Sequence, residues 1–366
     1  MNRIHAILQL MFFLSLACSI TGLTADDQST DNRSVDLPDA SPVQNEQPTA
    51  PAIVETAPVV TEAVDNPIPP VYVTVALHIE DLPVYARCDA YPDFRQKLLQ
   101  FAEAIAPYNT AVNLQIDYEF FVGVSRCETP AIQVDTQNLN VLDFLTELYG
   151  YEIDAHQEGG WDIEGRDNYA DIRYLGGQVA TAISENVGGL VWDDPAQWAT
   201  LASGERGLQY PEFTWTPQAL TLAVSSQHHL GDFTDDDIAS GVWIPKGAGN
   251  DFWIHDPNGS LIYIGPGEYD NWGSRGRKRS TLEFVQDILY QLKAGALDQN
   301  AMYTATIAVP QRIIFHPEEH AELLAIFDQL APLAAAGDLV YVTYSQAVEI
   351  WQTLYHARPN IYIHEP

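Results

Sequence analysis

From Val71 onward the chain alternates between strand-like runs and helix-like stretches, and this alternation limits the fold more than any other feature of the sequence. The run "VYVTVALHIED" (71–81) is apolar and β-branched, as buried strands are. In the stretch 91–108, apolar residues from Phe94 to Ile105 fall on one helical face. Strands that alternate with helices predict parallel pairing, and therefore an α/β sheet or barrel.

The alternation continues almost to the C-terminus, with one interruption. Further strands are expected at 111–124, 151–155, 187–193, 304–309, 312–316 and 339–344, and further helices at 140–149, 168–186, 281–295, 318–336 and 345–356. Between about 195 and 276 the rhythm gives way to Gly, Pro, Trp and Asp-rich turns, with short strand-like pieces at 219–226, 251–256 and 260–265. We predict a distorted (β/α) barrel with an irregular, β-rich insertion over one face.

The first 70 residues differ in composition from the rest of the chain. Residues 1–25 have a basic start, an apolar run and a small-residue cleavage point, a pattern typical of a signal peptide. Residues 26–70 are rich in Pro, Asp, Glu, Thr and Ala, which predicts a disordered acidic linker. The folded domain is therefore expected at 71–366. A retained N-terminus, or a lipid on Cys18, would instead tie the chain to a membrane.

Charge and cysteine content narrow the compartment and the partners. The formal net charge of −33 argues against nucleic acid, whose phosphates require a basic face. Once the signal peptide is removed, Cys88 and Cys127 remain. In the periplasm or outside the cell these two are expected to form a disulfide that joins the loops after the first two strands. Two buried thiols are the alternative.

Carboxylates and imidazoles stand where three of the expected strands end. They are His78, Glu80 and Asp81 at the first strand, Asp154, His156 and Glu158 at the third, and His316 at a late one. The carboxyl ends of parallel strands meet at one edge, where α/β proteins place their sites. Imidazole and carboxylate ligands suit a hydrolytic divalent metal, which makes a bound water acidic enough to attack.

These stretches resemble the motifs of the polysaccharide deacetylase (NodB-like) superfamily of metal-dependent carbohydrate esterases. "HIED" is similar to the first motif, which implies Glu80 as the base and Asp81 as a metal ligand. "GYEIDAH" is similar to the second and implies His156 as a ligand. "RIIFH…LVYVTYSQAVEIW" is similar to the last and implies His316 as the proton donor. The resemblance extends from Val71 to Trp351.

The chain also departs from that pattern. The second metal histidine of the family would fall on Gly160, which offers no ligand atom. Glu158, two residues after His156, is the natural substitute, and a His-x-Glu pair suits zinc or a harder ion such as manganese. In "SGVWIPKG", Ile244 stands where the family has an arginine.

Aromatic and acidic residues in the irregular middle suit sugar recognition, because ring faces stack on pyranose faces. The candidates are Trp243, Trp253, His255, Asp270 and Trp272. Packing is their alternative role.

The expected function is that of an exported, metal-dependent hydrolase that removes N- or O-acetyl groups from a carbohydrate. Two alternatives are open. One is a metal-independent glycoside hydrolase that pairs Glu80 or Asp81 with Glu158. The other is an inactive carbohydrate-binding or surface protein on the same scaffold. A lack of metal affinity would favour this alternative.

Overall fold

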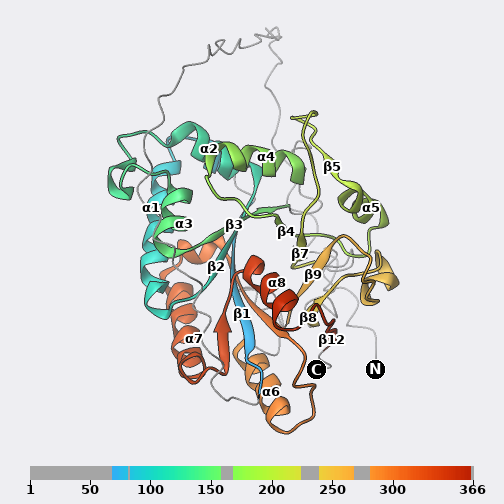
Figure 1. Cartoon of the computed structure of the whole chain (residues 1–366). Coiled ribbons are helices and arrows are strands. Elements are labelled where there is room, and N and C mark those ends of the chain that lie inside the picture. Colours follow the sequence, from blue (N-terminus) through green and yellow to red (C-terminus); the bar gives the residue numbers. More distant parts are fainter. Residues whose placement is uncertain (1–67, 81–82, 158–167, 224–238, 268–280, 364–366) are drawn as a thin grey trace, which may run out of the picture. The chain divides into compact units, whose positions relative to one another are not determined.

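The computed structural model describes residues 68–80, 83–157, 168–223, 239–267 and 281–363 (Figure 1). The predicted signal peptide, almost all of the predicted linker, and the site candidates Asp81, Glu158, Asp270 and Trp272 lie outside these residues. Within them, no helix is both long enough and apolar enough to span a bilayer.

Ten strands form one sheet, in which most neighbours are parallel. Its order is β10-β1-β2-β3-β4-β7-β9-β8-β12, with β11 beside the start of β1. The strands are β1 (Val71–Ile79), β2 (Val112–Ile116), β3 (Glu152–His156), β4 (Asn186–Gly188), β7 (Ala219–Thr221), β8 (Ala239–Trp243), β9 (Ile262–Pro266), β10 (Tyr303–Pro310), β11 (Leu339–Tyr341) and β12 (Tyr362–Ile363). A separate antiparallel pair joins β5 (Glu205–Arg206) to β6 (Thr214–Trp215).

Side-chain hydroxyls bring the two ends of this sheet together. Ser240 Oγ in β8 donates to the carbonyl oxygen of Thr304 in β10 at 2.7 Å and accepts from its amide at 2.9 Å. Thr304 Oγ1 accepts from the amide of Gly241 at 2.8 Å and donates to the carbonyl oxygen of Gly265 at 2.5 Å. These bonds replace part of a backbone ladder, so the sheet is a nearly closed barrel and the predicted α/β barrel is confirmed.

Helices cover the outer face of this sheet, and α1, α3 and α7 lie along one side of it in Figure 1. The helices are α1 (Tyr91–Ile105), α2 (Tyr118–Cys127), α3 (Val141–Tyr149), α4 (Tyr169–Val179), α5 (Pro195–Ser203), α6 (Thr281–Lys293), α7 (Pro317–Ala336) and α8 (Tyr344–Thr353). Alternate residues of β1, such as Val73, Val75 and Leu77, join the core cluster that includes Phe94 and Leu98 of α1. This follows from the period of two along a strand.

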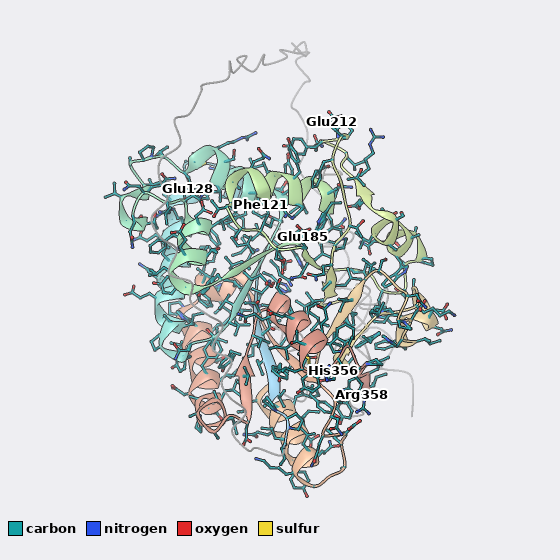
Figure 2. All side chains as sticks on the ribbon, in the orientation of Figure 1. Phe121, Glu128, Glu185, Glu212, His356 and Arg358 are labelled. Carbon is teal, nitrogen blue, oxygen red and sulfur yellow. A yellow bond between two sulfur atoms is a disulfide. The ribbon has the colours of Figure 1, made fainter. Side chains whose placement is uncertain are left out.

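The last helix, α8, packs on the other face. Its Tyr344, Ala347, Val348 and Trp351 form a second cluster with inward-facing residues of β1, β7 and β9. A capping box at Thr343 fixes its start. At the far end, Trp351 Nε1 donates to the carbonyl oxygen of Arg358 at 2.7 Å, which ties α8 to the segment before β12 (Figure 2).

The structure corrects the predicted strand at 111–124. Only its first part is a strand, β2, and the rest is helix α2. Asp117 causes the change, because its side chain accepts from the amide of Phe120 at 2.9 Å and so caps the helix. The apolar run that predicts one strand is divided by this N-cap residue.

The strand expected at 312–316 is wrong. β10 ends at Pro310, and a 3-10 helix (Gln311–Ile314) leads into α7, for which His316 is the N-cap residue. Residues 251–256 are not a strand either, because a 3-10 helix (Gly249–Trp253) occupies the first half of them.

The region predicted as a β-rich insertion, about 195–276, takes part in the main sheet. This region supplies β7, β8 and β9, which belong to the main sheet and complete the barrel. Those strands are short, and β8 runs antiparallel to β9, so the alternation of long strands and helices is lost there without any break in the sheet.

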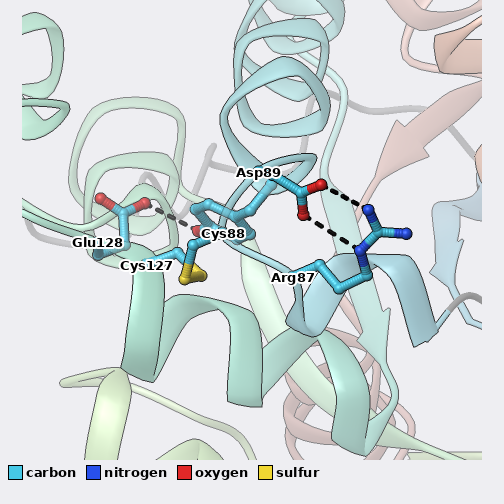
Figure 3. The surroundings of a disulfide bond; sticks show 6 residues. Arg87, Cys88, Asp89, Cys127 and Glu128 are labelled. Carbon is cyan, nitrogen blue, oxygen red and sulfur yellow. Dashed lines mark hydrogen bonds and ion pairs between the residues drawn. A yellow bond between two sulfur atoms is a disulfide. The ribbon is translucent and has the colours of Figure 1, made fainter.

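The predicted disulfide between Cys88 and Cys127 is confirmed, and it links positions 39 residues apart (Figure 3). Cys127 is the last residue of α2 and not part of a loop directly after β2. Beside it, Glu128 accepts from Arg95 Nε at 2.9 Å, and both side chains are 3% exposed. The bridge and this buried ion pair together attach the end of α2 to the start of α1.

Candidate metal centre

Three ligand-type side chains converge at the carboxyl ends of β1 and β3. His78 belongs to β1, Glu80 is the first residue after β1, and His156 is the last residue of β3. One ligand atom from each lies within 4.8 Å of the others. His78 is 7% and His156 4% exposed, while Glu80 is half-buried. The parallel pairing β1-β2-β3 places these two strand ends one strand apart.

Each oxygen of Glu80 faces one imidazole. Oε1 lies 3.6 Å from His78 Nδ1, and Oε2 is in direct contact with His156 Nε2. The two rings are tilted by 36° with centroids 4.7 Å apart. Burial alone would raise the pKa of Glu80, but the two imidazoles outweigh it and hold this pKa well below its ordinary value. Glu80 is therefore a carboxylate at neutral pH, able to bind a cation.

Gln311, the first residue after the neighbouring strand β10, fixes the backbone of Glu80. Its Oε1 accepts from the Glu80 amide at 2.8 Å and from Tyr85 Oη at 2.7 Å, and its Nε2 donates to the Glu80 carbonyl oxygen. Gln311 follows Pro310, which pairs with His78 in the β1–β10 register. Gln311 could not be predicted from the sequence, because only the register shows that the residue after β10 lies beside the end of β1.

Paired polar side chains form a row across β1, β2 and β3, just before these strands end. His78 pairs with Gln115 of β2, and Gln115 pairs with Asp154 of β3. Asp154 is fully buried and accepts from Asn113 Nδ2. Burial, and then the nearby Glu152 carboxylate, raise the pKa of Asp154 well above its ordinary value. Asp154, noted in the sequence at the end of the third strand, is thus an interior acid and not a ligand of the cluster.

His316 is not one of the three residues of this cluster. It is exposed at the N-cap of α7, and its neighbours face α1: Phe315 packs against Phe94 with centroids 5.5 Å apart, and His320 against Phe101 at 5.4 Å. Of the residues predicted for the metal and the chemistry, Glu80 and His156 are brought together. His78 joins them, although the sequence predicted it only as a strand-end residue.

The aromatic candidates belong to a packed layer. Trp243 is fully buried and its Nε1 donates to the carbonyl oxygen of Phe252 at 2.8 Å, so its predicted role in stacking on a sugar is wrong. Trp253 is half-buried, with its ring 5.9 Å from that of Trp243. His255 Nδ1 accepts from the Ile244 amide at 3.1 Å, and burial lowers the pKa of His255. These contacts are those of packing residues.

The donor set fits a divalent metal. Two imidazoles and one carboxylate are a common ligand set of catalytic zinc, with further positions left for water or substrate. Ligand atoms about 2.1 Å from a tetrahedral zinc lie about 3.4 Å apart. The 3.6 Å between His78 Nδ1 and Glu80 Oε1 is close to that separation. The contact between Glu80 and His156 is a hydrogen bond and would have to open to admit an ion.

The fold and this cluster define an α/β barrel protein with a candidate metal centre at the carboxyl ends of its strands. No protein-family model matches the sequence, and no curated protein matches it. Among solved structures, a 4-α-glucanotransferase from Thermococcus litoralis is similar with a TM-score of 0.42 and 13% identity, over 80% of this chain and 40% of that one. This chain therefore spans well under half of that enzyme's length.

Two further similar structures are proteins assigned as polysaccharide deacetylases. The one from Mycobacterium smegmatis has a TM-score of 0.41 and 12% identity, over 81% of this chain and 94% of that one. The one from Pseudomonas aeruginosa has a TM-score of 0.37 and 10% identity, over 77% and 91%. Likeness at this level says nothing about chemistry, which has to come from the side chains of the site.

Proposed function

We propose that this chain is an exported, metal-dependent hydrolase that removes acetyl groups from a carbohydrate. The observation that supports the metal is the cluster of His78, Glu80 and His156, whose donor atoms lie within 4.8 Å of one another. The carbohydrate and the acetyl group rest on the resemblance of "HIED" and "GYEIDAH" to deacetylase motifs. Export rests on the signal-like N-terminus together with the Cys88–Cys127 disulfide.

In this proposal His78, Glu80 and His156 hold the ion, zinc or manganese. A bound divalent ion acts as a Lewis acid and lowers the pKa of bound water toward neutrality. Glu80 brings the negative charge that attracts the ion, and Gln311 keeps its backbone in place. Asp81 and Glu158, which follow the same two strands, stay predicted ligands, and His316 stays the predicted proton donor.

Glu80 has two candidate roles, as the base predicted from the motif and as a ligand of the ion. The variant Glu80→Gln separates them, because a neutral amide oxygen binds a divalent ion far more weakly than a carboxylate does and cannot take up a proton at neutral pH. If Glu80 is the base, the variant keeps its metal and loses turnover by about 100-fold or more. If it is a ligand, metal content falls together with activity.

The first test is the metal content of the whole chain, measured by elemental analysis beside His78→Ala and His156→Ala. About one equivalent of zinc or manganese is expected in the parent, with loss in both variants. His255→Ala is the matched control, because this histidine lies in the packed layer and should leave the metal in place. Thermal melting of each variant separates loss of the ion from loss of the fold.

Acetate release from acetylated chitin or xylan oligosaccharides then tests the reaction. Activity that chelators abolish and the metal restores would support the proposal. No metal in the parent, and none bound on addition, would contradict it and leave a metal-free hydrolase or a carbohydrate-binding protein.

A further inference from the structure

We propose that Gln115 is a positioning residue of this centre. It holds the His156 ring by accepting a hydrogen bond from Nδ1 of that ring. The inference rests on the proposed metal-binding function and extends it to a residue that neither the motifs nor the ligand cluster include. Gln115 does not touch the ion in this proposal. It acts through the imidazole.

Gln115 has the right place in the barrel. It lies on β2, the strand between the one that carries His78 and the one that ends at His156. Its side chain is on the inward face, as its pairing with His78 and Asp154 shows. Glutamine is an unusual choice for a fully buried strand position, where an apolar residue would pack without any polar atom to satisfy.

Both amide atoms of Gln115 are buried, and neither has a hydrogen-bond partner in the part of the chain that the structure describes. An unpaired buried amide lowers the stability of the fold. A buried amide without a partner therefore needs an explanation. A function that requires the amide would explain why it is retained although it lowers stability. A partner that engages only when the site is loaded would provide it.

His156 has the complementary atom. Its Nδ1 is also buried and also has no hydrogen-bond partner among the described residues, while its Nε2 faces Glu80. When one ring nitrogen of a neutral imidazole binds a metal, the other carries a proton and needs an acceptor, usually a carboxylate or carbonyl oxygen. Gln115 Oε1 is such an oxygen.

Gly188, the last residue of β4, and Gly189 bring these two groups to the same place. A Cβ on Gly188, which pairs with His156, would stand 2.2 Å from Gln115 Oε1. A Cβ on Gly189 would stand 3.2 Å from Cε1 of the His156 ring. The amide and the imidazole therefore border neighbouring residues of one short segment. Gly188 leaves the space that the Gln115 amide occupies, and any larger residue would push that amide aside.

The test compares Gln115→Met with Gln115→Glu in the whole chain, using zinc and manganese as probes. Methionine keeps the volume without a strong acceptor, and glutamate keeps the acceptor. We expect zinc affinity, measured by competition with a chromogenic chelator, to fall about 10- to 100-fold in Gln115→Met. In Gln115→Glu it should equal or exceed that of the parent. Gly188→Ala should weaken binding as Gln115→Met does, because the displaced amide no longer reaches the ring.

Two controls separate positioning from folding. Gln329→Met changes an exposed glutamine of α7 and should alter nothing. Melting of the metal-free chain should show Gln115→Met to be at least as stable as the parent, because the unpaired amide is gone. A metal-free melting temperature that falls with the affinity would mean that Gln115 only supports the fold, and would overturn the inference.

The remaining outcomes are distinct. If the parent binds zinc and Gln115→Met binds it equally well, the positioning role is overturned and the metal site stands. If the parent binds no metal, the proposed function is overturned. In that case the positioning role, which engages only when the site is loaded, is overturned together with it.

Discussion

Two regions of this barrel were both expected from the sequence to contact a ligand, and they differ in how their polar atoms are satisfied. At the ends of β1 and β3, His156 Nδ1 and both amide atoms of Gln115 are buried without a hydrogen-bond partner among the described residues. In the aromatic layer around β8, Trp243 Nε1 bonds to Phe252 and His255 Nδ1 accepts from Ile244.

The difference indicates which region stabilises the fold and which serves a function. Polar groups that are fully paired inside a well-packed aromatic layer add to stability and have nothing left to offer a ligand. Polar groups that are buried unpaired reduce stability, and they are retained where something else completes them, which in our proposal is the ion. Substitutions in the two regions should therefore change different measurable quantities.

The largest effect is expected for Trp243→Ala in the aromatic layer. The ring is fully buried and packs against Tyr263 and Phe252 with centroids 4.7 and 5.8 Å away. Its removal should lower the free energy of unfolding by about 3–5 kcal/mol, measured by urea denaturation. Tyr290→Ala, which changes a side chain that is 72% exposed, should stay within about 0.5 kcal/mol of the parent.

Metal affinity of the folded Trp243→Ala chain should match that of the parent. A change in unfolding free energy below 1 kcal/mol, or a selective loss of metal binding, would mean that the two regions are not separate in the way their hydrogen bonds indicate.

Sequence patterns were sufficient for the elements whose signal is local. The run from Val71 to Ile79 is long and apolar, and the helix at 91–105 has regular spacing, so both were predicted with nearly correct ends. The disulfide was predicted from the expected compartment and the presence of just two cysteines after the signal peptide. Glu80 and His156 were predicted from strand ends and motif resemblance, and the structure brings them together.

What could not be predicted depends on register and burial. His78 and Glu80 are two residues apart in the chain, and only the position of His156 across β2 turns them into one cluster. Gln311 is 231 residues from Glu80 in sequence, and its role follows from the pairing of β10 with β1. Trp243 was predicted to stack on a sugar ring, because the sequence alone does not distinguish an exposed tryptophan from a buried one.

A smaller and more selective effect is expected for Gln311→Ala. The amide of this side chain binds both the N–H and the carbonyl oxygen of Glu80, so its loss frees the backbone that carries the carboxylate. Zinc affinity should fall about 10-fold, which is the lower end for residues that orient metal ligands. Unlike Trp243→Ala, this variant should unfold at a urea concentration close to that of the parent.

Gln299→Ala is the matched control for Gln311→Ala, because Gln299 also bonds through its amide to a backbone oxygen, that of Leu292, but lies on the exposed surface. Equal zinc affinity in Gln311→Ala and in this control would show that the backbone clamp does not matter for the site.

The smallest effect concerns pH and the aromatic layer. Burial lowers the pKa of His255, whose Nδ1 accepts from the Ile244 amide and so must stay unprotonated in the folded chain. A histidine with a lowered folded pKa stabilises the fold above its unfolded pKa, about 6.5, and this contribution is lost as the pH falls through the folded value.

His255→Asn keeps an acceptor for the amide but cannot titrate. The difference in unfolding free energy between parent and variant should therefore shift in favour of the variant between pH 7 and pH 5, measured by urea titrations at both values. A difference that stays constant with pH would show that His255 is not held neutral by its packing, and the aromatic layer would then share the unsatisfied character of the metal centre.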